Sequence, residues 1–288
     1  MQSNLGRVVR FMSALLMATG TPALADGHSE RLATALHAQS AEARARFVYR
    51  HPAGTLEFFG VKPGMTVVEV LPGEGWYSKI LLPYLGPEGQ LIGADYPLGI
   101  FVHMGFFSDE WLEERKTWTT TWPREAETWR GKDGASVSAI VLDTIPASAR
   151  SSVDAVLLIR ALHNLARFDQ RGGYLTTALT NVYDVLKPGG IVGVVQHLAR
   201  EERPDDWANG SRGYLKKSFV IARMEAAGFK FAGESDINAN PKDQPGDNDI
   251  VWRLPPTLVT SRGDPELRQQ MEAVGESNRM TLKFIKPE

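Results

Sequence analysis

Short runs of β-branched and other apolar residues alternate, along residues 64–235, with segments in which apolar side chains recur every three to four positions. The first pattern is typical of buried strands and the second of amphipathic helices. Their alternation predicts βαβ units, and therefore a mostly parallel α/β sheet covered by helices on both faces. We expect strands at 66–71, 90–94, 137–142, 153–159, 191–196, 229–235 and 280–285, and helices at 76–84, 108–118, 174–186 and 215–227, after a helical lead-in at 26–60.

Two segments between the expected strands are longer than the usual connection of about two to six residues. They cover residues 96–136 and 236–279, and the second contains five prolines, which disfavour regular structure. We interpret both as insertions in a single domain at residues 61–288. Both leave the carboxyl edge of the predicted sheet, where open α/β sheets bind their ligands, so both are candidates to cover a pocket.

The first 25 residues have the pattern of a secretory signal peptide. Two arginines precede the apolar run 11–17, and Ala23-Leu24-Ala25 forms an A-x-A cleavage pattern. A membrane anchor is the alternative, but the run is much shorter than the roughly 20 apolar residues that a spanning helix needs. We therefore predict cleavage after Ala25, a periplasmic mature protein and no stable insertion into the membrane.

Composition excludes several classes of function. Removal of residues 1–25 takes away two arginines and no acid, which leaves 30 basic and 34 acidic residues. This balance, and the absence of any long block of Lys or Arg, argue against a nucleic-acid partner. The chain has no cysteine, so disulfides, thiolate metal sites and a cysteine nucleophile are excluded.

The stretch VVEVLPGEGWYSKILLPYLG at residues 67–86 begins as a buried strand, turns at a Pro-Gly pair and continues as an amphipathic helix. Glu69 stands near the end of the strand, ahead of a glycine-rich turn. This arrangement brings backbone N–H groups and a carboxylate close to a ligand. A tight turn between strand and helix, without any ligand, is the alternative interpretation.

Five motifs together resemble the class I S-adenosylmethionine-dependent methyltransferases, and more closely a group of exported bacterial proteins described as predicted methyltransferases. The motifs are EVLPGEGWY (69–77), LIGAD (91–95), RALHN (160–164), LKPGG (186–190) and ESNRMTLKF (276–284). They occur in order over roughly residues 40–288. The resemblance implies a Rossmann-like, seven-stranded, mostly parallel sheet with an antiparallel last strand, and S-adenosylmethionine as the cofactor.

The resemblance also implies roles for individual residues. Glu69 would approach the methionine end of the cofactor, and Gly73 and Gly75 would let the backbone pass close to it. Asp95 would accept hydrogen bonds from the two ribose hydroxyls, a task that suits the paired oxygens of a carboxylate. Asp143 matches a position that often meets the adenine amino group, although an aspartate that starts a turn explains it equally well.

The loop departs from the family pattern of acid-x-Gly-x-Gly-x-Gly. Leu71 stands at the first glycine, and Pro72 after it has no N–H to donate. We keep Leu71 among the cofactor-binding candidates because the other two glycines are present. Trp76 and Tyr77 follow the loop, and their rings either stack on a ligand or, as is commoner, pack on the sheet.

Candidate catalytic groups follow two neighbouring strands of the predicted sheet. His163 comes after the fourth strand and His197 after the fifth, so both imidazoles should lie on the ligand-binding edge, where either can take a proton from an acceptor. Structural hydrogen bonding is the alternative role for each. Arg160, a cofactor-binding candidate, is also suited, with Tyr49 and Arg50, to gripping an anionic group; salt bridges are the alternative. A metal site with His103 lacks the supporting ligand spacing.

Four tryptophans at positions 111, 118, 122 and 129 share one helix face if a helix continues through Pro123. Such a stripe is usually part of the core, and an apolar acceptor pocket is the alternative.

The leading functional hypothesis is an enzyme that transfers a methyl group from S-adenosylmethionine to a small molecule. Its rival is a periplasmic binding protein on the same fold, because an exported enzyme would need a cofactor that is made in the cytoplasm.

Overall fold

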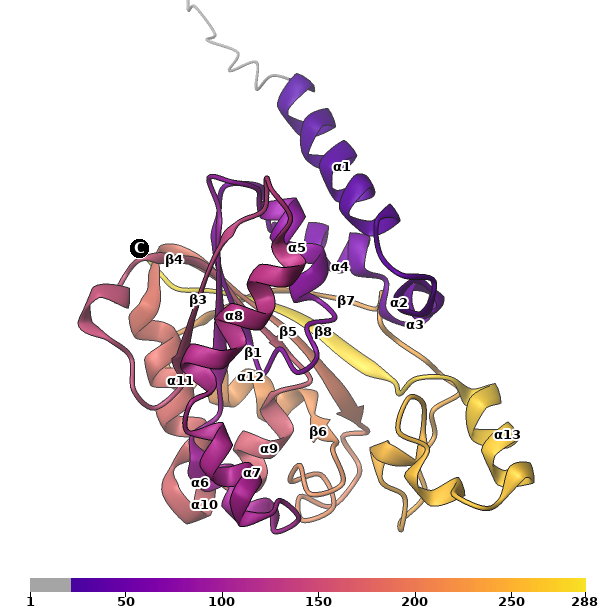
Figure 1. Ribbon diagram of the computed structural model, residues 1–288. Helices are drawn as coiled ribbons and strands as arrows, with labels where there is room; N and C mark the ends of the chain where they lie inside the picture. Colours follow the sequence, from indigo (N-terminus) through magenta and orange to yellow (C-terminus); the bar gives the residue numbers. More distant parts are fainter. Residues whose placement is uncertain (1–21) are drawn as a thin grey trace, which may run out of the picture.

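The computed structural model describes residues 22–288, and a single mixed sheet forms the centre of the molecule (Figure 1). Its strands are β1 (Thr66–Val70), β2 (Gln90–Asp95), β3 (Ser136–Val141), β4 (Val153–Ile159), β5 (Leu186–Ala199), β6 (Leu215–Lys216), β7 (Lys230–Ser235) and β8 (Arg279–Ile285). The predicted signal peptide lies almost entirely in residues 1–21, outside the described residues.

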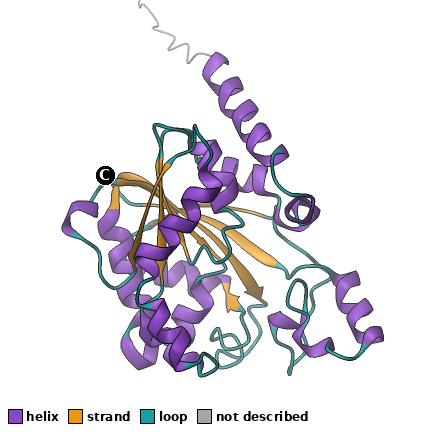
Figure 2. Ribbon diagram, in the orientation of Figure 1, coloured by secondary structure: helices purple, strands orange, loops and turns teal. Residues whose placement is uncertain are grey.

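Thirteen α-helices and three 3₁₀ turns surround the sheet over residues 22–288 (Figure 2). The helices are α1 (Pro22–His37), α2 (Ala41–Ala45), α3 (Phe47–Arg50), α4 (Pro52–Phe59), α5 (Ser78–Leu85), α6 (Leu98–Met104), α7 (Asp109–Arg115), α8 (Trp118–Arg130), α9 (Leu162–Arg167), α10 (Asp169–Gly172), α11 (Tyr174–Val185), α12 (Lys217–Ala226) and α13 (Pro265–Val274). The 3₁₀ turns are η1 (Ala147–Ala149), η2 (Val251–Arg253) and η3 (Val259–Ser261).

The strand order is β3-β2-β1-β4-β5-β8-β7, with β6 attached to the end of β5. All pairs in it are parallel except those that β8 makes with β5 and with β7. This topology confirms the predicted fold class, a mostly parallel sheet with an antiparallel last strand and helices on both faces. The two-residue strand β6 is an eighth strand that the sequence pattern did not predict.

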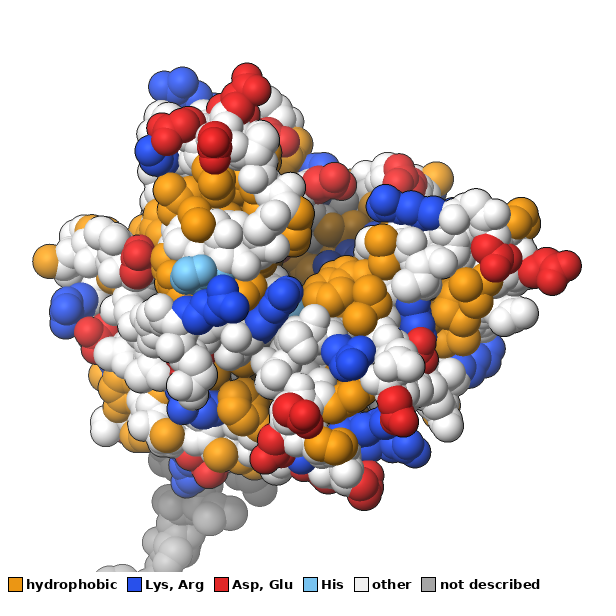
Figure 3. Space-filling model, turned by 90° about the horizontal axis from the view of Figure 1, so that it is seen from below, with side chains coloured by type: hydrophobic (Ala, Val, Ile, Leu, Met, Phe, Trp, Pro, Cys, Tyr) orange, Lys and Arg blue, Asp and Glu red, His pale blue; other side chains and the backbone are white. Residues whose placement is uncertain are grey.

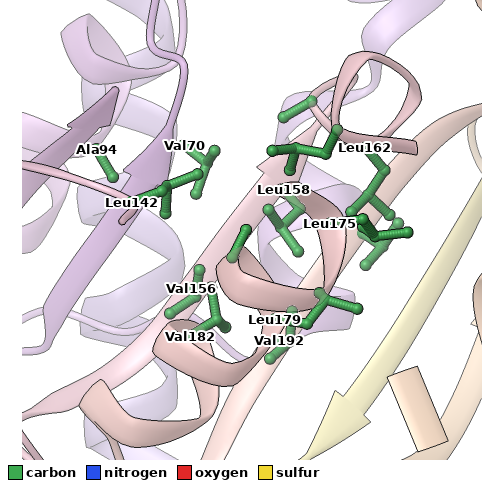
Figure 4. Close-up of a cluster of buried hydrophobic side chains, with 14 of the residues drawn as sticks. Val70, Ala94, Leu142, Val156, Leu158, Leu162, Leu175, Leu179, Val182 and Val192 are labelled. Atoms are coloured by element: carbon green, nitrogen blue, oxygen red, sulfur yellow. The ribbon is translucent and has the colours of Figure 1, made fainter. Parts of the chain in front are cut away.

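Side-chain alternation along the strands separates two cores. Val68 and Val70 of β1 belong to one core, which α6, α9, α11 and α12 cover (Figure 4). Val67, which precedes Val68, belongs to the second core, which α1, α4, α5 and α8 cover. Because successive strand residues point to opposite faces, the position of Glu69 next in this row places its side chain on the α5 side of the sheet.

The first long connection, residues 96–136, forms α6, α7 and α8. We expected one helix at 108–118, but α7 ends at Arg115 and α8 starts at Trp118. Helix α8 does continue through Pro123, and Trp118 and Trp122 stack at 5.4 Å between ring centroids inside the second core. Trp118 and Trp122 therefore belong to the core, as such stripes usually do, whereas Trp129 is partly buried against the same core and Trp111, on α7, packs against the first core.

None of the helices at residues 22–288 has the length and apolar character that crossing a membrane requires.

Candidate functional site

A cavity of about 490 Å³ lies at the carboxyl ends of β1, β4 and β5. The loop after β1, the ends of β4 and β5, and residues 251–257 and 276–277 line it, together with Arg46 and Arg50 from the helical lead-in. Figure 3 views this side of the molecule and shows a hollow with basic side chains in and around it. The second long connection thus provides one wall of the cavity, whereas residues 96–136 do not line it.

The loop after β1 is built from left-handed backbone conformations. Gly73 and Gly75 have positive φ angles of 58° and 76°, and Leu71 has one of 52°. This conformation costs a residue with a Cβ about 1–2 kcal/mol, and glycine avoids the cost. Leu71 therefore adopts a backbone conformation that favours glycine; the residue lines the cavity and packs against the first core.

The ten residues proposed from the sequence as catalytic or cofactor-binding divide into two sets of five. Leu71, Gly73, Arg160, His163 and His197 meet at the cavity. The other five do not line it; they are Glu69, Gly75, Tyr77, Asp95 and Asp143.

Glu69 of β1 is covered by helix α5. Its side chain is buried, and Oε2 accepts a hydrogen bond of 2.6 Å from Ser78 Oγ. Burial raises the pKa of Glu69 to about 8, although Ser78 and the Arg160 charge act in the opposite direction. At neutral pH this carboxyl is therefore mostly protonated.

Asp95, the expected ribose ligand, is already paired. Arg115 of α7 donates from Nε to Oδ2 and from Nη2 to Oδ1, both at 2.7 Å. The same guanidinium lies over the rings of Phe101, Trp111 and Trp118, with 5.0–5.2 Å to the ring centroids. Both acceptor oxygens of Asp95 are thus engaged by a side chain of the first insertion.

Gly75, Tyr77 and Asp143 contact other residues of the fold and do not line the cavity. A Cβ on Gly75 would lie 2.3 Å from the ring of Trp129, so a tryptophan occupies the space beside this glycine. Tyr77 is buried, and its hydroxyl donates to the backbone oxygen of Arg50 at 3.4 Å. Asp143 is exposed and accepts from Thr144 Oγ1 at 3.0 Å, as an aspartate in a turn does.

An arginine cluster surrounds Glu276. Its Oε1 accepts from Arg46 Nη2 at 2.5 Å and from Arg50 Nε at 3.1 Å, and its Oε2 accepts from Arg279 Nη1 at 3.2 Å. The side chains of Arg50, Arg279 and Glu276 are 3–4% exposed. Burial, followed by the charge of Arg160, lowers the pKa of Arg50 to about 10. Burial would raise the pKa of Glu276, but the arginines outweigh it and the pKa lies below its ordinary value.

The two histidines lie 5.6 Å apart between ring centroids. Gln196 donates from Nε2 to the Gly213 oxygen at 2.8 Å, so its Oε1 faces His163 Nδ1 at 3.4 Å as an acceptor. This assigns the proton of neutral His163 to Nδ1 and leaves Nε2 free to accept one. Burial lowers the pKa of His163 to about 4. Burial, and next the neighbouring His163, lower the pKa of His197, whose Nδ1 lies 2.6 Å from Ser277 Oγ.

His103 is not part of this site. Its ring packs beside Phe168 and Tyr174, at 5.7 and 5.8 Å between centroids. Over residues 22–288, no group of three or more His, Cys, Asp or Glu side chains has an arrangement that would hold a metal ion.

Sequence reasoning missed Arg46, Arg115, Trp252 and the Glu276–Ser277 pair as site residues. Arg46 and Arg50 meet Glu276 across more than 220 positions of chain. Glu276 and Ser277 begin one of the family-like motifs, which was the signal available for them. Nothing in the sequence around Arg115 indicates that it pairs with Asp95.

No protein-family model matches the chain, and no curated protein matches it. Among solved structures it is similar to an S-adenosylmethionine-dependent methyltransferase from Aquifex aeolicus, with 14% identity, a TM-score of 0.49, and coverage of 88% of this chain and 98% of that one. It is also similar to an arsenic(III) S-adenosylmethionine methyltransferase from Chlamydomonas reinhardtii, with 15% identity, a TM-score of 0.46, and coverage of 90% and 73%. The third is the [4+2]-cyclase SpnF, with 17% identity, a TM-score of 0.48, and coverage of 83% and 80%.

The class of fold follows from the strand order of this chain.

The two ends of S-adenosylmethionine would not fit this site equally well. Beside the loop, a Cβ on Gly73 would meet nothing within 4 Å, and Arg160 and Arg50 offer cations to a carboxylate. The aminoacyl end of the cofactor therefore fits. The ribose end fits only if Arg115 leaves Asp95, because both carboxylate oxygens are engaged.

Proposed function

We propose that this protein is an S-adenosylmethionine-dependent methyltransferase whose acceptor is a small molecule bound in the cavity. The observation that carries the proposal is that the glycine-containing loop after β1 forms a wall of a cavity at the carboxyl ends of β1 and β4. Ligands of open α/β sheets bind at this edge. A cavity of about 490 Å³ also has the size of a small-molecule site.

The cofactor, when bound, supplies an electrophilic methyl group, and the protein has to position the acceptor and receive its proton. Gly73 and Arg160 would hold the aminoacyl end, and Asp95 the ribose. His163 lines the cavity, and its Nε2 would act as the base. Trp252 and Pro255 form an apolar part of the lining.

Replacement of Arg115 by glutamine is expected to raise the affinity for S-adenosylhomocysteine about tenfold or more. Glutamine removes the bidentate ion pair and frees both oxygens of Asp95 for a vicinal diol. Isothermal titration calorimetry of the native chain and the variant with S-adenosylhomocysteine measures the effect. Arg124→Gln is the matched control, because Arg124 is an exposed arginine of the same insertion, on α8.

The Asp95–Arg115 pair also favours a second candidate function, a non-catalytic binding protein on the same fold. In that case the ion pair is a permanent part of the structure and the cavity holds another ligand. Absence of binding heat with S-adenosylhomocysteine for both the native chain and Arg115→Gln would support this candidate and contradict the first.

Export to the periplasm is part of the proposal and rests on the pattern of residues 1–25 alone. Residues 1–40 fused to a reporter enzyme that is active only outside the cytoplasm are expected to give activity. Replacement of Arg7 and Arg10 by glutamate in the same fusion is expected to reduce it. An inactive fusion that is nevertheless produced in full would place the chain with the cytoplasmic cofactor pool.

A further inference from the structure

The cavity and the arginine cluster beside it have more positive charge than their acidic side chains balance. Arg46, Arg50 and Arg279 share the single carboxylate of Glu276. Glu74 is the other acid of the cavity lining, and it is exposed. Buried charges in proteins are normally paired, because an unpaired charge loses its hydration without compensation.

Arg160 adds a fourth cation that has no partner of its own. Within residues 22–288 its guanidinium forms no ion pair and no hydrogen bond, and the half-buried residue lines the cavity. Its positive charge acts to lower the pKa of Glu276 and of Glu69, but neither carboxyl group lies within ion-pair distance of it.

The backbone holds Arg160 in this place at a cost. Its φ angle is 58°, a left-handed conformation that is rare outside glycine, and its N–H donates to the Val195 oxygen at 2.6 Å. Strained residues of this kind persist where the surrounding structure fixes them, and they gather at ligand sites. The strain turns the chain at the end of β4, at the edge of the cavity.

We infer that the cavity contains a subsite for the carboxylate or phosphate group of a small molecule, with Arg160 as its principal cation and Arg50 beside it. A planar guanidinium offers two parallel N–H donors to such a group. The anion supplies the counter-charge that the four arginines lack, and it binds where Arg160 has no protein partner. The inference is independent of methyl transfer and holds for either candidate function.

Two ligands can bring this anionic group into the cavity. One is the aminoacyl carboxylate of S-adenosylmethionine, and the other is an acidic group on a second small molecule. The two sources are separated by S-adenosylhomocysteine, which has the carboxylate, and 5′-methylthioadenosine, which lacks it.

The experiment is calorimetric titration of the full chain and of Arg160→Gln with inorganic phosphate and with succinate, at constant ionic strength in chloride. The native chain is expected to bind at least one of the two anions, and Arg160→Gln to bind it at least tenfold more weakly. Arg160→Lys keeps the positive charge but lacks the two parallel N–H donors of a guanidinium, so an intermediate loss of affinity is expected. Arg124→Gln removes one exposed positive charge outside the cavity and should bind as the native chain does.

A thermal unfolding measurement separates this role from a structural one. Removal of an unpaired cation from the cluster should leave the melting temperature unchanged or raise it, whereas loss of a structural arginine would lower it. If Arg160→Gln weakens S-adenosylhomocysteine but not 5′-methylthioadenosine, the subsite belongs to the cofactor. If it weakens only phosphate or succinate, the subsite belongs to a second ligand.

The inference is overturned if Arg160→Gln binds every anion as well as the native chain does, or if the native chain binds none of them. Failure of S-adenosylhomocysteine to bind, with phosphate or succinate still bound through Arg160, would contradict methyl transfer and leave the subsite in place.

Discussion

Replacement of Glu276 by glutamine is expected to lower the free energy of unfolding by about 3–5 kcal/mol, the range for breaking a buried ion pair from one side. Glutamine has nearly the same shape, so the loss comes from charge and hydrogen bonding rather than from a cavity. Three arginines would then share a neutral amide. The NH₂ group of this amide is itself a donor, and it would face the N–H donors of the arginines.

The geometry explains why this single carboxylate has so large an effect. Glu276 joins Arg46 and Arg50, from the helical lead-in, to Arg279 at the start of β8. Arg279 also donates from Nη2 to the Tyr49 oxygen at 2.5 Å, so the lead-in is held to the last strand by the same cluster. Loss of the carboxylate leaves buried guanidinium groups unpaired and weakens the attachment of the lead-in.

Urea denaturation at pH 7 measures the difference, and Glu272→Gln is the matched control. Glu272 pairs with Arg268 at 3.0 Å on the exposed helix α13, where both side chains are about half exposed. Such a surface pair contributes only about 0.3–0.5 kcal/mol. Equal stability of Glu276→Gln and the control would contradict the buried cluster.

The strands were the most predictable part of the fold. Periodicity located seven of the eight, because β-branched runs bounded by turns are distinctive in a sheet buried on both faces. Strand β6 was missed because its two residues carry no pattern; its pairing with Leu198 and Ala199 at the end of β5 defines it. Strand β5 also starts at Leu186, earlier than expected, because Leu186 pairs with Val153 of β4 and because Gly189 and Gly190 exchange hydrogen bonds with Lys286 beyond β8.

The candidate site was predictable only where it depends on local sequence. Arg160 and His163 follow the end of β4, and His197, which we expected just after the fifth strand, lies inside β5 near its end. Parallel topology brings such ends together. The pairings of Glu276 and Asp95 depend on side chains brought together by tertiary packing, for which the sequence has no local signal. Glu69 is an instructive case, because its place between Val68 and Val70 already assigns it to the opposite face from them.

Replacement of Glu69 by glutamine is expected to stabilise the protein increasingly as pH rises from 5 to 8. The pKa of Glu69 is about 8 in the fold because of burial, against an ordinary value of 4.5. Between these values the folded chain keeps a proton that the unfolded chain has lost. Stability therefore falls as pH rises, by about 1.4 kcal/mol per pH unit, and the loss is complete above the folded pKa.

Glutamine has no proton to lose and still offers an oxygen to Ser78 Oγ, so the variant lacks this pH dependence. The difference in free energy of unfolding between variant and native chain should grow by about 3–5 kcal/mol from pH 5 to pH 8 and stay level above. The buried histidines act in the other direction: burial lowers the pKa of His163 to about 4, so its contribution is lost as pH falls below its ordinary value of 6.5. This contribution is the same in both chains and cancels in the difference.

Urea denaturation at pH 5, 6, 7, 8 and 9 and constant ionic strength tests this, with Glu88→Gln as a control that removes an exposed carboxylate elsewhere on the surface. The control should follow the native curve at every pH. A difference for Glu69→Gln that is independent of pH would show that the carboxylate is ionised in the fold. The charge of Glu69 would then offset part of the charge of Arg160, and the unbalanced positive charge at the cavity would be smaller than the ion pairs indicate.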